Sequence, residues 1–256
     1  PTLNNMGNVL RELGGYDKAI SSFKKAIQVK PNYAEAYSNL GWTFYTIRQF
    51  EEALVSYNKA LSINPNLTEA LFNKSLCNLM LGDYENGWRD YEYRKLQPFH
   101  KPRKFSIPMW TGSESLNNKS IFIYAEQGLG DTIQFCRYIP ILADRGAKVF
   151  FEPQPQLRNL FAQENLASKI VSTPVDESDY DYQCSLMSLP FACKTSANSI
   201  PNQIPYIKPD ASKVKSWTMK LADINGPRVG LVWSGGFRPN QPELWAVNER
   251  RNISFS

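Results

Sequence analysis

Residues 1–94 repeat with a period of 34 residues, and this period limits the possible folds more than any other feature. Small residues, aromatic residues and prolines each recur at fixed places in the repeat. These columns are Gly7, Gly41 and Ser75; Phe23, Tyr57 and Tyr91; and Pro31 and Pro65. Small residues let two helices approach closely, and a proline ends a helix. The pattern predicts a solenoid of antiparallel helix pairs, each stacked on the next.

This period and its columns resemble the tetratricopeptide repeat. The resemblance is strong in the first two repeats. The third departs at Lys74, Gly87 and Arg94, where the pattern requires apolar or small residues. Terminal repeats are atypical because one face no longer meets a neighbour. We interpret the third repeat as a cap that joins the solenoid to the next domain, with Trp88, Tyr91 and Tyr93 packed across the joint.

Asn5, Asn39 and Asn73 share one position on the first helix of each repeat. Each amide offers a donor and an acceptor, so such a ladder can bind the backbone of an extended peptide. In this respect the array is similar to the repeat superhelix of O-linked N-acetylglucosamine transferases. The alternative is that asparagine is simply common at this position. The predicted partner is a peptide in the repeat groove.

A second feature lies at residues 120–135. The apolar run 121–125 indicates a buried strand, and Gly128 and Gly130 follow it, where they would allow a sharp turn and close approach of a ligand. Asp131 is expected to be the N-cap of the next helix. A strand, a glycine turn and a helix N-terminus together form the crevice where open α/β sheets bind ligands.

Strand-like and helix-like segments alternate beyond this turn. We expect strands at 148–152, 169–172 and 182–186, and helices at 132–144, kinked by Pro140, and at 155–163. This alternation predicts a parallel, doubly wound sheet. Residues 95–118 and 201–209 are interpreted as extended, proline-containing linkers, the first with a solvated basic cluster.

A helix capped by Asp210 and a strand at 228–233 predict the start of a second α/β domain. Both ends of the sequence look cut, so we expect a fragment of a longer protein. The predicted organisation is repeats at 1–94, a linker at 95–118, a Rossmann-like domain at 119–209, and at 210–256 a connecting helix with the truncated start of a second Rossmann-like domain.

Composition excludes several classes of function. The net charge of +5 is too mild to indicate nucleic acid, and no apolar run approaches the length of a membrane span. The four cysteines are far apart, which indicates reduced thiols in a cytoplasmic protein rather than disulfides or a zinc site. With His100 as its single histidine, the chain is unsuited to a Ser-His-Asp triad or a multi-histidine metal centre.

A dinucleotide oxidoreductase is one reading of the glycine turn. Gly128 and Gly130 follow a strand, and Glu152 ends the next one, where a ribose-binding acid would stand. The third glycine of that motif is replaced by Ile133, whose branched side chain would push the helix off the strand. Asp131 would also face the phosphates with the wrong charge. The match to this class is weak.

A second reading comes from resemblance. The segments 108–112, 126–132, 137–140 and 230–235 look like bacterial proteins that join these repeats to a glycosyltransferase of the two-Rossmann-domain (GT-B) kind. The α/β part is similar to the lipopolysaccharide heptosyltransferase family and, more distantly, to the O-linked N-acetylglucosamine transferases. The resemblance implies the N-terminal half of a GT-B fold, a nucleotide-sugar donor, a protein or glycan acceptor, and neither metal nor cofactor.

The same resemblance implies roles for individual residues. Asp131 falls on the proposed catalytic base, which would take a proton from the acceptor hydroxyl; its alternative role is only to cap the helix. Further substrate-binding candidates are Gln127, Gly128 and Gly130 on the acceptor side and Ser234, Gly235, Gly236, Arg250 and Arg251 on the donor side. Because the donor domain is cut off, we expect this chain alone to be inactive. The rival function is a protein-binding scaffold with a vestigial α/β domain.

Overall fold

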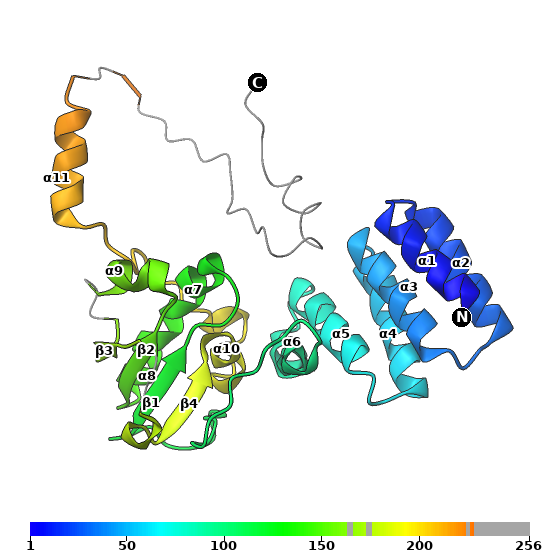
Figure 1. Ribbon diagram of the computed structural model, residues 1–256, viewed down its shortest axis with the longest axis horizontal. Helices are drawn as coiled ribbons and strands as arrows, with labels where there is room; N and C mark the ends of the chain where they lie inside the picture. The colour runs from blue at the N-terminus through cyan, green and yellow to red at the C-terminus, as the bar shows by residue number, and fades with distance from the viewer. Residues whose placement is uncertain (163–165, 173–175, 224–225, 228–256) are drawn as a thin grey trace. The chain divides into compact units, whose positions relative to one another are not determined.

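The computed structural model describes residues 1–162, 166–172, 176–223 and 226–227 (Figure 1). The chain divides into two compact units, Pro1–Lys208 and Pro209–Ser256. The first unit contains the helix pairs and the sheet, and the second contains α11, Ala211–Lys220. Asp210 caps α11 as expected, since its side chain accepts the backbone N–H of Lys213 at 2.9 Å. The strand predicted at 228–233 lies outside the described residues.

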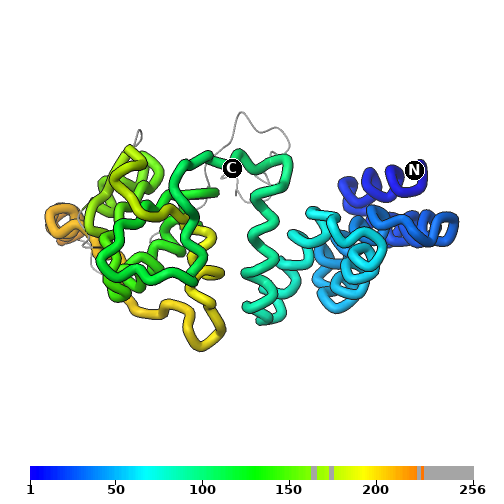
Figure 2. Tube along the Cα trace, turned by 90° about the horizontal axis from the view of Figure 1, so that it is seen from below, coloured from blue at the N-terminus to red at the C-terminus, as the bar shows by residue number. Residues whose placement is uncertain are grey.

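Three antiparallel helix pairs form residues 2–91, which confirms the solenoid (Figure 2). Each helix packs against its partner in the pair, and neighbouring pairs pack through α2 with α3 and α4 with α5. The helices are α1 Thr2–Glu12, α2 Tyr16–Val29, α3 Ala34–Thr46, α4 Phe50–Ile63, α5 Thr68–Met80 and α6 Tyr84–Tyr91. As predicted, both helices end just before a proline: Pro31 and Pro65 each follow the C-cap residue of α2 and α4.

The turn within each pair needs a left-handed residue. Gly14 and Gly82 supply it in the first and third repeats with φ of 79° and 84°. In the second repeat the same place is taken by Arg48, with φ of 64°. Because side chains with a Cβ rarely adopt this conformation, the surrounding helices must hold the Arg48 turn in place.

The third repeat continues past α6 into a 3-10 helix, Glu92–Leu96. Trp88 packs edge-on against Phe135, with ring centroids 5.9 Å apart, so the predicted contact across the joint is found. Tyr91 also lies in the core shared with the sheet. Arg94, which breaks the repeat pattern, is almost fully buried. The third repeat therefore packs against the sheet, and the buried cation Arg94 lies in the contact between them.

A four-stranded parallel sheet follows, in the order β3-β2-β1-β4. Its strands are β1 Ser120–Tyr124, β2 Lys148–Glu152, β3 Lys169–Ile170 and β4 Tyr182–Ser185. The parallel α/β arrangement is confirmed. The chain steps outward from β1 to β3 and then returns to the other side of β1, so the direction reverses between β1 and β4.

Short helices pack on the face of the sheet that carries Ile121, Ile123, Val149 and Phe151. The helices of this part are α7 Leu129–Phe135, α8 Ile139–Asp144, α9 Arg158–Phe161 and α10 Leu189–Ala192. On the opposite face Phe122 and Tyr124 meet Tyr180 and Phe105, with ring centroids 5.3 Å and 5.0 Å apart. Aromatic rings thus cover this part of the sheet, and the doubly wound arrangement stays a prediction.

The single kinked helix expected at 132–144 is wrong in two respects. Its first part, α7, begins three residues earlier, at Leu129. A 3-10 turn, Cys136–Tyr138, then separates it from α8, and Pro140 lies in the first turn of α8. Proline has no N–H to lose at a helix start, so this residue begins a helix rather than bending one.

The linker at 95–118 is mostly exposed, as expected, but it is not a free tether, because part of it is bound to the sheet. Pro108 and Trp110 exchange backbone hydrogen bonds with Gln183 of β4, at 3.0 and 2.9 Å. The Trp110 side chain is buried in the core. Arg103 from the basic cluster pairs with Glu152 and lies over the rings of Phe122 and Tyr124. The segment around Met109 therefore pairs with β4 at the edge of the sheet.

Candidate functional site

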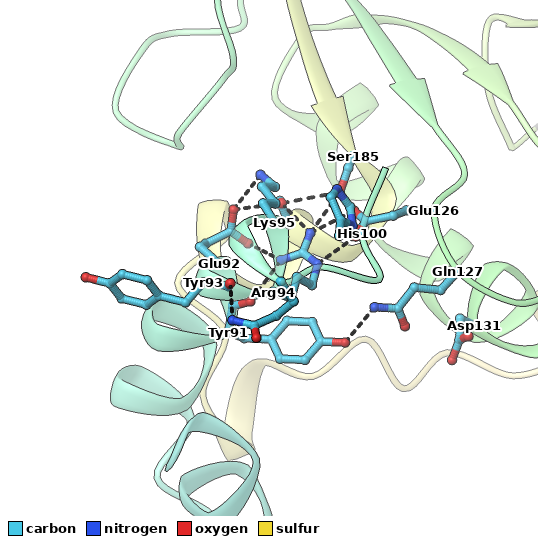
Figure 3. Close-up of polar contacts among 12 residues, drawn as sticks. Tyr91, Glu92, Tyr93, Arg94, Lys95, His100, Glu126, Gln127, Asp131 and Ser185 are labelled. Atoms are coloured by element: carbon cyan, nitrogen blue, oxygen red, sulfur yellow. Dashed lines mark hydrogen bonds and ion pairs between the residues drawn. The ribbon is translucent and has the colours of Figure 1, made fainter. Parts of the chain in front are cut away.

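The loop 125–128 crosses the carboxyl end of β1 and leads into α7 (Figure 3). The sharp turn was expected at the glycines, but Gln127 makes it, with φ of 67°. Gly128 is the N-cap, in extended conformation, and Gly130 is helical. A Cβ on Gly130 would meet nothing within 4 Å. The start of α7 is therefore open, and Leu129 beside it is exposed.

Asp131 is the third residue of α7 and not its N-cap, which corrects the expectation from the sequence. Its carboxylate oxygen Oδ2 accepts the backbone N–H of Gly128 at 2.9 Å. This is one half of a capping box, because the glycine at the N-cap has no side chain to return the bond. The carboxylate thus lies at the positive end of the helix, half-buried at the mouth of the loop.

Gln127 and Gln154 tie the loop to its surroundings. The amide Nε2 of Gln127 donates to the hydroxyl of Tyr91, in the last repeat helix, at 2.8 Å (Figure 3). The amide Nε2 of Gln154 donates to the carbonyl oxygen of Gln127 at 3.2 Å. The loop is thus held from the solenoid on one side and from the segment after β2 on the other.

Arg94 and Glu126 form the principal electrostatic contact of this region (Figure 3). Nε and Nη2 of Arg94 donate to the two carboxylate oxygens of Glu126, each at 2.8 Å. Burial alone would raise the pKa of Glu126, but the hydrogen bonds and charge of Arg94 lower it below its ordinary value. The pKa of Arg94 is raised despite burial by the same pairing. Both groups are therefore held in the charged form.

This cluster was missed by sequence reasoning. Its other members accept from Arg94 or lie beside Glu126, namely Glu92, Ser185, Ser188 and His100. The only signal was a charged residue at Arg94, where the repeat pattern requires an apolar or small one. The partner Glu126 lies 32 residues further along the chain, beyond the reach of any local pattern.

The predicted asparagine column lies on α1, α3 and α5, the first helix of each pair. Asn5 is exposed, Asn39 is half-buried and Asn73 is buried. The amide of Asn39 donates to Oδ1 of Asn4 at 3.0 Å, which links two repeats. The amides of the first two repeats are thus more accessible than that of Asn73, and peptide binding by this column stays a prediction.

The candidate residues on the donor side cannot be located in the structure. Ser234, Gly235, Gly236, Arg250 and Arg251 lie outside the described residues. Glu152, the candidate ribose-binding acid, is paired with Arg103. Among the described residues there is no group of three or more side chains that could hold a metal ion. None of the helices in the described ranges has the length and apolar character needed to cross a membrane.

The first helix pairs match known repeat families. Residues 7–47 match the TPR repeat family and residues 34–67 match the tetratricopeptide repeat family. The chain is also similar to Protein FlbA of Caulobacter vibrioides, with 25% identity over 254 residues that cover 90% of this chain and 42% of FlbA. The chain thus spans less than half the length of that curated relative.

Solved structures resemble the repeat part. One is the first TPR of Spaghetti (RPAP3) bound to HSP90 peptide SRMEEVD, at 25% identity and a TM-score of 0.37, covering 39% of this chain and 79% of that one. Another is the MamA protein, at 25% identity and a TM-score of 0.35, covering 37% and 52%. The two family matches and the observed helix pairs, rather than these structures, identify residues 7–67 as tetratricopeptide repeats.

Proposed function

We propose that the chain is the acceptor-binding part of a glycosyltransferase, in which the repeats bind a peptide and the loop 127–131 receives its hydroxyl group. The open start of α7 carries this proposal. A Cβ on Gly130 would meet no other part of the described chain, and the carboxylate of the next residue, Asp131, is held at Gly128 in the same helix start, at the carboxyl edge of a parallel sheet. This edge is where open α/β sheets bind their ligands.

The chemistry suits a carboxylate at this place. An acceptor hydroxyl must lose its proton as it attacks the anomeric carbon of a nucleotide sugar, and a general base within hydrogen-bond reach can take it. Asp131 has one oxygen engaged with Gly128 N–H, which fixes the orientation of the carboxylate. The donor would be held by residues beyond 227, among which Arg250 or Arg251 would neutralise the leaving phosphate.

The repeats supply acceptor binding in this proposal. Their amides at Asn5 and Asn39 can hydrogen-bond to the backbone of an extended peptide without selecting its side chains. Tyr91, in the last repeat helix, bonds to Gln127 of the loop. A peptide in the repeat groove would therefore be held by the same compact unit as the loop.

The test uses the full-length protein with a panel of nucleotide sugars and a protein acceptor. In the double variant Asn5→Ala/Asn39→Ala we expect KM for the acceptor to rise roughly tenfold, from the loss of a few hydrogen bonds. Hydrolysis of the donor should not change. Asn58→Ala is the matched control, because Asn58 is an exposed amide on the second helix of its pair. Unchanged KM in the double variant would remove the repeats from acceptor binding.

A protein-binding scaffold is the second candidate. The crevice between β1 and β4 is filled by Arg94 and its partners rather than left open, which favours this class. Its expected result is that no nucleotide sugar is hydrolysed or transferred by the full-length protein, while the repeats still bind a partner protein. Sugar transfer that depends on Asp131 would exclude the scaffold.

A further inference from the structure

The last repeat reaches the carboxyl edge of the sheet, where Arg94 contacts the last residue of β4. We propose that Arg94 is a positioning residue, which the repeat array inserts between the ends of β1 and β4 to fix the conformation of the loop 126–131. This inference rests on the proposed function only where it takes that loop as the substrate site. It concerns the structure of the loop itself, so it can be tested whether or not the protein transfers sugar.

The guanidinium group of Arg94 is fully satisfied by its surroundings. Besides the two bonds to Glu126, Nη1 donates to Glu92 at 2.7 Å and to the carbonyl oxygen of Tyr91 at 3.3 Å. Nη2 also donates to the hydroxyls of Ser185 at 3.0 Å and Ser188 at 2.9 Å. All its donor groups are used in a fixed planar fork, an arrangement that a lysine ammonium cannot reproduce.

The Arg94 guanidinium group lies where ligands bind in many open α/β sheets. In open α/β sheets the ligand site lies outside the carboxyl ends of the strands, where the strand order reverses. Here the order reverses between β1 and β4, which end at Tyr124 and Ser185 in register. Arg94 contacts Ser185 at that point. The protein thus fills the crevice with its own cation and leaves the outer side of the loop, at Gly130 and Asp131, for a substrate.

The loop has a conformation that needs such support. Gln127 has a φ of 67°, which side chains with a Cβ rarely adopt. Unfavourable backbone conformations persist only where the surroundings determine them. The residue before it, Glu126, is held by Arg94, and Gln127 itself is held by Tyr91, whose ring lies 4.8 Å from the Arg94 guanidinium carbon. Both holding residues belong to the last repeat.

A buried ion pair is weak evidence of stabilisation in itself, since apolar residues of similar size often serve as well. A positioning role and a stabilising role therefore predict different results for two variants. Arg94→Ala leaves the Glu126 charge without its main partner. Arg94→Met/Glu126→Leu removes both charges and refills the space, so it should recover much of the lost stability but not the loop conformation.

The experiment is amide hydrogen exchange on the whole chain. The reporters are the N–H groups of Gly128 and Thr132, which are bonded to the Asp131 carboxylate and to the Gly128 carbonyl oxygen. In Arg94→Ala we expect about a hundredfold faster exchange at these amides relative to β2, because one partner of a buried pair is lost. Added methylguanidinium should restore protection, because it can occupy the vacated site.

Two further variants complete the test. Arg89→Ala is the matched control, since Arg89 is an exposed arginine of α6 that pairs with its neighbour Asp90, and its loop exchange should equal that of wild type. Arg94→Lys keeps the charge without the fork and should give intermediate exchange, which also covers the case that Arg94→Ala does not fold. The proposal is overturned if Arg94→Met/Glu126→Leu is folded and protects Gly128 and Thr132 as wild type does. It is equally overturned if Arg94→Lys exchanges as wild type does.

Discussion

The ring of Tyr57 lies so close beneath Gly41 that a Cβ on Gly41 would be 2.8 Å from Cε1 of Tyr57. One repeat earlier, a Cβ on Gly7 would be 2.5 Å from Cε1 of Phe23. The small and aromatic columns of the 34-residue repeat are therefore the two sides of one contact. In the first two pairs, the first helix lacks a side chain where the second inserts a ring.

The first prediction concerns this contact. Gly41→Ala should lower the free energy of unfolding by about 1 kcal/mol, since overpacking of a filled core costs about 1–3 kcal/mol and the gain in helix propensity offsets part of it. The matched control is Gly130→Ala, a helical glycine with open space around it, which should be neutral or slightly stabilising. Urea denaturation of both variants measures the difference. Equal stabilities would mean that the ring of Tyr57 is free to shift.

The fold was predictable from the sequence where the pattern is local or periodic. The columns of Gly41 and Tyr57 and the prolines after α2 and α4 determine the helix pairs, and β2 has the predicted bounds. The break between α7 and α8 was not predictable, because a proline in an apolar helical pattern is compatible with a kink or with a new start. Only the packing of Ile139 and Leu142 against the sheet selects the second.

The site was predictable only in part. The glycines and Asp131 were correctly placed after β1. The sequence could not show that Gln127 makes the turn and that Gly128 is the N-cap, because a shift of a single residue in the backbone conformation changes both assignments. Trp110 and Arg94 were assigned to a tether and to an irregular repeat. Their buried positions result from contacts with Gln183 and Glu126, far away in the sequence, which no local pattern reports.

The second prediction is a pH dependence from Glu126. Its pKa is lowered in the folded state, so the stabilisation is complete above the ordinary value of 4.5 and is lost as pH falls through the lowered pKa. Glu126→Gln should be about 3 kcal/mol less stable than wild type at pH 7, as for other broken buried pairs. Below both pKa values the wild-type side chain is also neutral, so the difference should shrink. Denaturation of both proteins across this range measures it; a difference that is constant with pH would contradict the pairing.

The third prediction concerns the thiols. All four cysteines are free, and burial raises the pKa of Cys77 to about 12 and of Cys193 to about 11. The thiolate is the reactive form, so a thiol reagent at pH 8 should label the folded protein slowly and all four thiols at once in denaturant. Cys193, which is half-exposed, should react first. Cys193→Ser should remove that first phase and Cys77→Ser should not; fast labelling of the folded protein would contradict this.

The fourth prediction concerns the donor. The crevice between β1 and β4 is filled by Arg94, and the donor-side candidates lie beyond residue 227. Calorimetry of this chain with UDP-, GDP- and ADP-sugars should therefore show no binding tighter than millimolar. A millimolar Kd corresponds to about 4 kcal/mol of binding free energy. A micromolar affinity would place the donor site in the domain at 119–209 and reverse the assignment of the two sides.

The fifth prediction separates the two roles of Asp131 in the full-length protein. Asp131→Asn keeps an oxygen that can accept the Gly128 N–H, so it should lose only the charge at the helix N-terminus, about 0.3–1 kcal/mol. It removes the base. If Asp131 is the base, turnover should fall about 100-fold or more, the usual contribution of general-base catalysis.

Asp131→Ala is the companion variant, because it removes the cap together with the base. It should lose about 1 kcal/mol of stability beyond Asp131→Asn, since the Gly128 N–H is left without its acceptor. Its turnover should match that of Asp131→Asn, because both lack the carboxylate. Rate and melting temperature measured on both variants separate the roles. If Asp131 only caps the helix, the melting temperature of Asp131→Ala should fall while the turnover of Asp131→Asn stays at the wild-type value. If Asp131 is the base, turnover should fall equally in both variants. Wild-type turnover in Asp131→Asn would end the catalytic assignment and leave Asp131 as the residue that holds Gly128 at the start of α7.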